Sequence, residues 1–200
     1  MINNEKQFWD WFKANEAKYY FLNQIDDENE RERLLDELLF HLQEYCDQLF
    51  FEVGGVPDEK QDLILSAGGN TDFFNKVEDL VSQAPSLEYW NIITFKPARE
   101  EYKIEYNGIK LNPDEMYFIP LSSKASQQIG LRVYIEDYNS LNQADFLVAT
   151  YLVLDNVLGE KSSALDIGYV EIEDLSVISE IDELIELVKL PRYIKWKKSK

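Results

Sequence analysis

The sequence has few of the side chains on which many catalytic and metal sites depend. Its 200 residues include one cysteine, Cys46, and one histidine, His41. A single cysteine cannot form an intramolecular disulfide, which excludes a disulfide-stabilised secreted scaffold and fits a reducing compartment. Zinc usually takes three or four cysteine and histidine ligands, so we expect no zinc site and no cofactor.

Long hydrophobic runs are also missing. No apolar stretch reaches the roughly 20 residues that a transmembrane helix requires. The first residues, Met-Ile-Asn-Asn-Glu-Lys-Gln-Phe-Trp-Asp, lack the basic and then apolar regions that typify a signal peptide. We therefore expect a cytoplasmic protein without a transmembrane segment.

Basic residues are outnumbered along most of the chain. There are 38 acidic and 20 basic residues, which give a formal net charge of −18. A field of that sign repels phosphate backbones, so we expect no nucleic-acid binding by the acidic body. The exception is a basic C-terminal tail, 191–200, which holds five basic residues and no acid.

Apolar and aromatic residues are plentiful, at 45% and 14% of the chain. This composition argues against disorder, and a chain of this length buries roughly 70% of its unfolded surface. Two amphipathic helices are predicted first, over residues 5–22 and 29–48. The second has apolar residues spaced three and four apart, as in a helix that packs on a core. They are Leu35, Leu38, Leu42, Tyr45 and Leu49.

The rest of the chain predicts two units of the ββαβ type, with a pseudo-repeat over 49–97 and 115–173. A glycine-rich turn separates the first two strands, and Asn107-Gly108 predicts a tight hairpin between the units. The helix of the second unit is expected over 142–158, and a last helix over 179–190 that Pro191 ends. We predict a single α+β domain over 1–200, with a largely antiparallel sheet and helices packed on it. Internal duplication and independent reuse of a stable arrangement both remain open.

The most site-like local feature is the turn from the second strand to the following helix, Ser66, Gly68, Gly69, Asn70 and Thr71. Backbone amides in such a turn can hold an anion at a helix N-terminus. The turn lacks the Lys-Ser/Thr ending of a P-loop and the spacing of a dinucleotide fingerprint. Ordinary turn chemistry is therefore the alternative interpretation.

Catalysis by a serine or cysteine nucleophile usually requires an adjacent base, and His41 is the sole histidine. Cys46 lies five residues further along the predicted helix, about 140° away around its axis, so the two cannot form a local dyad. Glu37 is one turn before His41 and could orient its imidazole. An ordinary intrahelical pair is the favoured interpretation.

The segment 62–97 combines several short motifs. They are Leu65-Ser66-Ala67-Gly68-Gly69-Asn70, Phe73, Phe74, Val77, Leu80-Val81, Ala84-Pro85 and Trp90 to Pro97, with fainter support from Leu158-Gly159-Glu160, Ile167-Gly168 and Leu190-Pro191. This combination resembles bacterial proteins of an α+β family that is classed only as a domain of unknown function. The resemblance implies no activity and no site residues.

The leading functional hypothesis is a non-catalytic binding or regulatory protein with a protein partner. The acidic charge favours a basic partner, for instance a toxin masked by an immunity-type protein. Trp9, Tyr20 and Trp196 are candidate exposed aromatic residues for such binding. One alternative is an enzyme that uses carboxylates or the turn near Ser66 to Thr71. Another is a homodimer formed through an uncovered sheet edge.

Overall fold

The computed structural model describes residues 4–56, 59–99, 103–121, 128–178 and 184–200. It has an α+β fold, and its contacts divide the chain into two compact units, Met1–Lys96 and Pro97–Lys200. The expectation of one domain over 1–200, and of a pseudo-repeat within it, stays a prediction.

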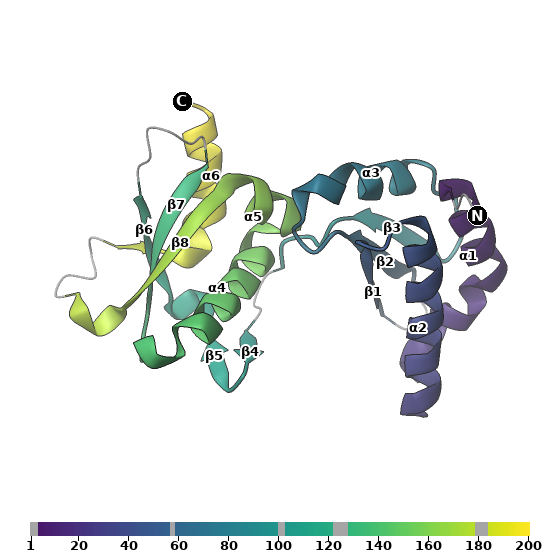
Figure 1. The fold of residues 1–200 in the computed structure, drawn as a ribbon, viewed down its shortest axis with the longest axis horizontal. Helices are drawn as coiled ribbons and strands as arrows, with labels where there is room; N and C mark the ends of the chain where they lie inside the picture. Colours follow the sequence, from purple (N-terminus) through teal and green to yellow (C-terminus); the bar gives the residue numbers. More distant parts are fainter. Residues whose placement is uncertain (1–3, 57–58, 100–102, 122–127, 179–183) are drawn as a thin grey trace. The chain divides into compact units, whose positions relative to one another are not determined.

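The first unit begins with the two predicted helices, α1 (Glu5–Tyr20) and α2 (Glu28–Tyr45). Each helix is preceded by an N-cap residue whose side chain accepts a hydrogen bond from a backbone amide of the first turn. Asn4 accepts from the Gln7 amide at 3.0 Å, and Asp27 accepts from the Asn29 amide at 3.0 Å. The two helices pack against each other beside a sheet (Figure 1).

That sheet contains β1 (Phe50–Gly54), β2 (Gln61–Ser66) and β3 (Trp90–Thr94), in that spatial order. Strands β1 and β2 are antiparallel, as expected for neighbours joined by a short loop. Strands β2 and β3 are parallel, because α3 (Phe74–Ser82) provides the crossover connection between them.

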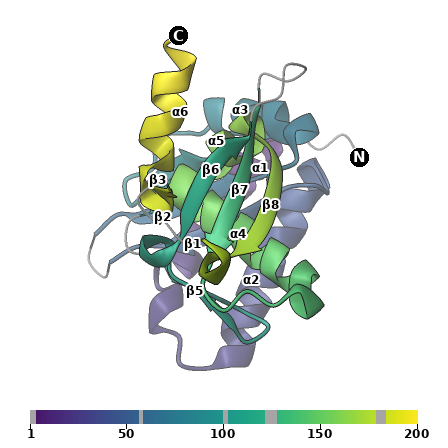
Figure 2. The ribbon, with the colours of Figure 1, turned by 90° about the vertical axis from the view of Figure 1, so that its left-hand side faces the viewer.

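The second unit also has two strands, a helical connection and a third strand in chain order, and its sheet has four strands in the spatial order β8-β7-β6-β9. Its strands are β6 (Tyr117–Leu121), β7 (Ile129–Ile135), β8 (Ile167–Asp174) and the short β9 (Ile185–Glu186). The connection from β7 to the parallel β8 consists of α4 (Gln143–Leu158) and α5 (Glu160–Asp166). Figure 2 shows β6, β7 and β8 with α4 behind them.

A hairpin of β4 (Ile104–Tyr106) and β5 (Ile109–Leu111) packs against α4. Its turn is the predicted Asn107-Gly108 pair, and both residues have positive φ, at 47° and 81°. These are the backbone angles that a tight two-residue turn between twisted strands requires. The sequence signal for this hairpin is therefore confirmed.

Two parts of the predicted architecture are wrong. The described strands form three separate sheets rather than one. Four of their six pairings are antiparallel, and β2–β3 and β7–β8 are parallel because helices follow β2 and β7. The helix expected over 179–190 is wrong in its described part, because residues 184–190 contain β9, the 3-10 turn Leu187–Lys189 and the start of the last helix. Residues 179–183 lie outside the described residues. Pro191 does not end a helix here. It lies in the first turn of α6 (Leu190–Lys198), where its missing amide costs nothing.

The basic tail is consequently a helix that packs on the core of its own unit. Leu190 and Ile194 are buried, and the Tyr193 ring meets the ring of Phe118 on β6 with centroids 5.7 Å apart. The Lys198 ammonium lies 2.7 Å from the carboxylate of Asp166, whose side chain is nearly buried. Arg192 and Lys195 are exposed on this helix, while Leu190 and Ile194 contribute to the core.

Tyr19, on α1, is fully buried, yet its hydroxyl has no hydrogen-bond partner among the described residues. Burial raises the pKa of this phenol, and the nearby Glu37 carboxylate raises it further. The neutral phenol is thus favoured in the folded state. The stability that this preference contributes is present below about pH 10 and is lost as the pH rises above it, because the unfolded chain ionises first.

We expect Tyr19→Phe to leave the free energy of unfolding unchanged or to raise it by up to about 1 kcal/mol, because it removes an unsatisfied buried hydroxyl. The matched control is Tyr45→Phe. The Tyr45 hydroxyl lies 3.1 Å from Glu5 Oε1 and 3.2 Å from the Lys76 carbonyl, so its loss should cost about 1 kcal/mol. Urea denaturation at neutral pH measures both. A larger loss in Tyr19→Phe than in Tyr45→Phe would contradict this account.

Candidate functional site

The predicted anion-binding turn lies at the end of β2. Ser66 is buried there, and Gly68 and Gly69 adopt positive φ values of 59° and 80°. The Ser66 hydroxyl accepts a hydrogen bond from the Gly68 amide at 2.9 Å. Asn70 caps the short 3-10 turn Thr71–Phe73 that precedes α3, accepting from the Asp72 amide at 3.2 Å.

Four amides of this turn and the residues after it already donate to its own side chains and carbonyls. Besides those of Gly68 and Asp72, the Asn70 amide donates to the Ala67 carbonyl, and the Phe73 amide donates to the Asn70 carbonyl. The carboxylate of Asp72 adds a negative charge beside them. Turn chemistry therefore accounts for these hydrogen bonds, and anion binding here stays a prediction.

The histidine is held in an intrahelical pair, although with a different partner from the one considered above. His41 Nδ1 lies 3.1 Å from Glu44, three residues further along α2, whereas Glu37 pairs with Lys18 at 3.1 Å. The Trp11 ring lies over the imidazole with a centroid separation of 4.0 Å. The described residues contain no group of three histidine, cysteine, aspartate or glutamate side chains placed to hold a metal ion.

A pocket in the first unit brings aromatic rings and a carboxylate together. It has a volume of about 380 Å³ and lies between the C-terminal end of α1 and the beginning of β3. Its lining residues are Glu16, Ala17, Tyr20, Phe21, Tyr89 and Trp90, and we call it the aromatic pocket. Glu16, Ala17 and Tyr20 share one side of α1, because residues three and four positions apart are neighbours on a helix.

The rings stand at steep angles to one another. The Tyr20 ring is 4.9 Å from Phe21 at an interplanar angle of 87°, and 5.4 Å from Tyr89 at 63°. The Tyr20 hydroxyl donates to the Glu59 carbonyl at 3.2 Å, which fixes the direction of the central ring. Phe21 and Tyr89 remain about half exposed, at 52% and 50%. Parts of both residues are therefore accessible to a ligand.

Buried neighbours hold the base of the aromatic pocket in place. Trp90 is 3% exposed and packs edge-to-face on Phe12, with a centroid separation of 5.2 Å. The backbone amide of Gln61 donates to the Tyr89 carbonyl at 2.8 Å, at the end of the sheet where β2 and β3 begin to pair. The pocket is thus preformed by the same contacts that connect α1 to the sheet.

The electrostatics of the aromatic pocket favour a positive charge. Glu16 Oε2 is shielded from solvent and has no hydrogen-bond partner among the described residues. The negative end of the α1 dipole also lies here, because the helix ends at Tyr20. Residues 1–96 contain 20 acidic and 8 basic residues, so this unit alone carries a formal charge of −12.

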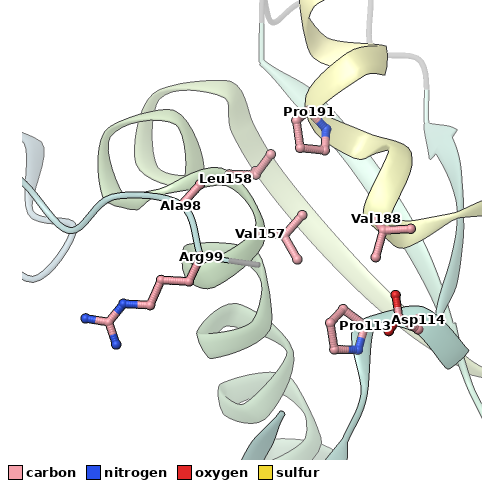
Figure 3. A pocket seen from close by; sticks show the side chains of 8 residues that line it. All are labelled: Ala98, Arg99, Pro113, Asp114, Val157, Leu158, Val188 and Pro191. Carbon is pink, nitrogen blue, oxygen red and sulfur yellow. The ribbon is translucent and has the colours of Figure 1, made fainter. Parts of the chain in front are cut away.

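A second pocket, in the other unit, is a mostly apolar groove of about 540 Å³. It is lined by the end of α4, the start of α6 and the segments around Ala98 and Pro113 (Figure 3). Its charged residues are Arg99 and Asp114, and the Arg99 guanidinium points away from the groove. The two charged groups do not converge on a common point, so the groove offers a ligand little beyond apolar contact.

Sequence reasoning identified one residue of the aromatic pocket, Tyr20, and misplaced another aromatic residue. Trp9 was expected to be exposed, but it is 3% exposed and its indole N–H donates to the Leu80 carbonyl at 2.7 Å. Trp9 lies three residues before Phe12, a spacing that could have placed it on the buried face. Trp196 is 50% exposed, as expected.

Comparison of the chain with protein-family models, curated proteins and solved structures finds no match. In the described residues, no helix has the length and apolar character to cross a membrane. The aromatic pocket and the negative charge of the first unit are the features of the molecule that bear on its function.

Proposed function

We propose that this protein is a non-catalytic binding or regulatory protein that engages a basic protein partner through its first unit. The observation that supports this most directly is the aromatic pocket, where four aromatic residues and Glu16 line one cavity. Glu16 Oε2 has no hydrogen-bond partner in the part of the chain that the structure describes. Aromatic residues are enriched at the centres of protein interfaces, where they supply large contact areas.

The charge distribution supports a basic partner in particular. The first unit holds −12 of the net charge of −18, so its field attracts cations from several ångströms away and repels other acidic proteins. Complementary charge raises association rates and suppresses wrong partners more than it raises affinity. Masking of a basic toxin-like protein would use both effects.

Affinity capture from native lysate, with the full-length chain as bait, tests this proposal. We expect a specific basic protein to be retained at low salt and mostly lost at high salt, because the screening length falls from about 10 Å at 0.1 M to about 3 Å at 1 M. The identified protein is then purified, and its association rate is measured. Failure to retain a specific protein, or retention of proteins without excess basic charge, would overturn the proposal.

Matched charge variants make the test specific to the first unit. Neutralising three exposed acids there should lower the association rate about tenfold at low salt. The changes are Asp26→Asn, Asp36→Asn and Asp79→Asn. The control removes the same number of negative charges from exposed positions of the second unit. Its changes are Glu115→Gln, Glu136→Gln and Glu173→Gln. Equal effects of the two triple variants would show that net charge, and not the first unit, determines association.

A further inference from the structure

From the aromatic pocket we infer that this protein binds an arginine side chain of its partner, an inference that rests on the proposed function and specifies its chemistry. Cations bind over the faces of aromatic rings, and tryptophan and tyrosine attract them most strongly. Here two rings stand steeply to the ring of Tyr20, so a cation that enters meets aromatic surface on more than one side.

The carboxylate of Glu16 adds the acceptor that a guanidinium requires. Its Oε2 has no hydrogen-bond partner among the described residues, although it is shielded from solvent, and such a group gains when a charged donor reaches it. Lysine and arginine both carry the right charge. Arginine is favoured because its guanidinium is planar, stacks on aromatic faces, is weakly hydrated and can donate to both carboxylate oxygens.

The size and setting of the aromatic pocket agree with this occupant. A volume of about 380 Å³ accommodates one long side chain together with its methylene stem, which the rings of Phe21 and Tyr89 can cover. The end of α1 contributes the negative end of its dipole at the same place. An apolar anchor, such as a leucine side chain, would fill the space and supply no donor to the shielded Oε2 of Glu16.

The probe is a short peptide, Ac-Gly-Gly-Arg-Gly-Gly-NH2, titrated into the ¹⁵N-labelled full-length chain. Its control replaces arginine with citrulline, which keeps the shape and removes the charge. We expect the arginine peptide to shift the amide resonances of Tyr20, Phe21 and Tyr89, with at least about tenfold weaker binding by the citrulline peptide. Equal binding of the two peptides, or shifts elsewhere only, would overturn the inference.

Two variants and two matched controls assign the binding to the aromatic pocket. Glu16→Gln and Tyr89→Leu should each weaken arginine-peptide binding about three- to tenfold, in line with single cation–π and charge-assisted contacts. Glu32→Gln and Phe40→Leu change an acid and an aromatic ring that are exposed on α2, and should leave binding unchanged. The ¹⁵N spectrum of each variant shows that it is folded.

The same variants, used as bait, separate failure of this inference from failure of the proposed function. If a basic partner is retained as well by Glu16→Gln and Tyr89→Leu as by the unchanged chain, the proposed function stands and the arginine site is wrong. If both variants lose the partner while Glu32→Gln and Phe40→Leu keep it, the inference is supported. If the unchanged chain retains no basic protein, the proposed function fails, and the peptide titration still decides whether the pocket binds arginine.

Discussion

Replacement of Phe12 by alanine is expected to lower the free energy of unfolding by about 3–5 kcal/mol, the usual cost of removing a buried phenylalanine ring. Phe12 is fully buried on α1. Its ring lies within about 6 Å of those of Phe8, Trp9 and Tyr19, and 5.2 Å from that of Trp90 on β3. The alanine variant would leave a cavity at the point where the helix meets the sheet.

Urea denaturation followed by circular dichroism measures this loss. The control is Phe40→Ala, which removes a ring of the same type from α2 at a position that is 61% exposed, and should change stability by less than about 1 kcal/mol. If the two variants lost equal stability, Phe12 would not be the packing centre that the ring contacts indicate. Because Trp90 packs on Phe12, this variant should not be used to test the aromatic pocket.

Hydrogen exchange of the same Phe12→Ala variant tests the prediction of a single domain. If residues 1–200 unfold as one cooperative domain, the loss of protection should extend from the amides of β2 to those of β7 in the second unit. If protection falls in β2 alone, the two compact units unfold separately. The measurement requires assigned amides in both strands and no further substitution.

Much of the local structure could be predicted because its signals are local. The leucine spacing in 29–48 reports the buried face of α2, and Asn107-Gly108 supplies the positive φ angles that a tight hairpin needs. The helix expected at 142–158 is observed as α4, Gln143–Leu158. Each of these signals depends on a few neighbouring residues and needs no information about distant contacts.

The error in the sheet concerns contacts between distant segments. Whether two strands pair in parallel depends on the connection that joins them, and the division into three sheets depends on which edges meet, which no short window contains. The aromatic pocket also depends on contacts between segments that are distant in the sequence. Tyr20 and Tyr89 are 69 positions apart in the sequence and are brought together because α1 packs beside the start of β3. Tyr20 was a candidate for its residue type alone.

A chain that ends at Pro191 is expected to lose at least about 3–5 kcal/mol of stability, because the C-terminal segment is a packed helix and not a frayed tail. The truncation removes Ile194, which is 4% exposed, together with the Tyr193 ring that covers Phe118. It also removes Lys198 and leaves the nearly buried carboxylate of Asp166 without its closest cation.

Thermal and urea denaturation of three chains tests the role of this helix. Ile194→Ala keeps every charge of α6 and should cost about 2–4 kcal/mol through the cavity alone. A chain that ends at Lys198 keeps the core contacts and the Asp166 pair, so it should match the full-length chain to within about 0.5 kcal/mol. If the chain ending at Pro191 were as stable as the one ending at Lys198, the basic segment would not contribute to the core. If Ile194→Ala and the truncation both lose stability, the basic residues of α6 are displayed on a fixed helix, and their charge acts at a defined surface of the second unit.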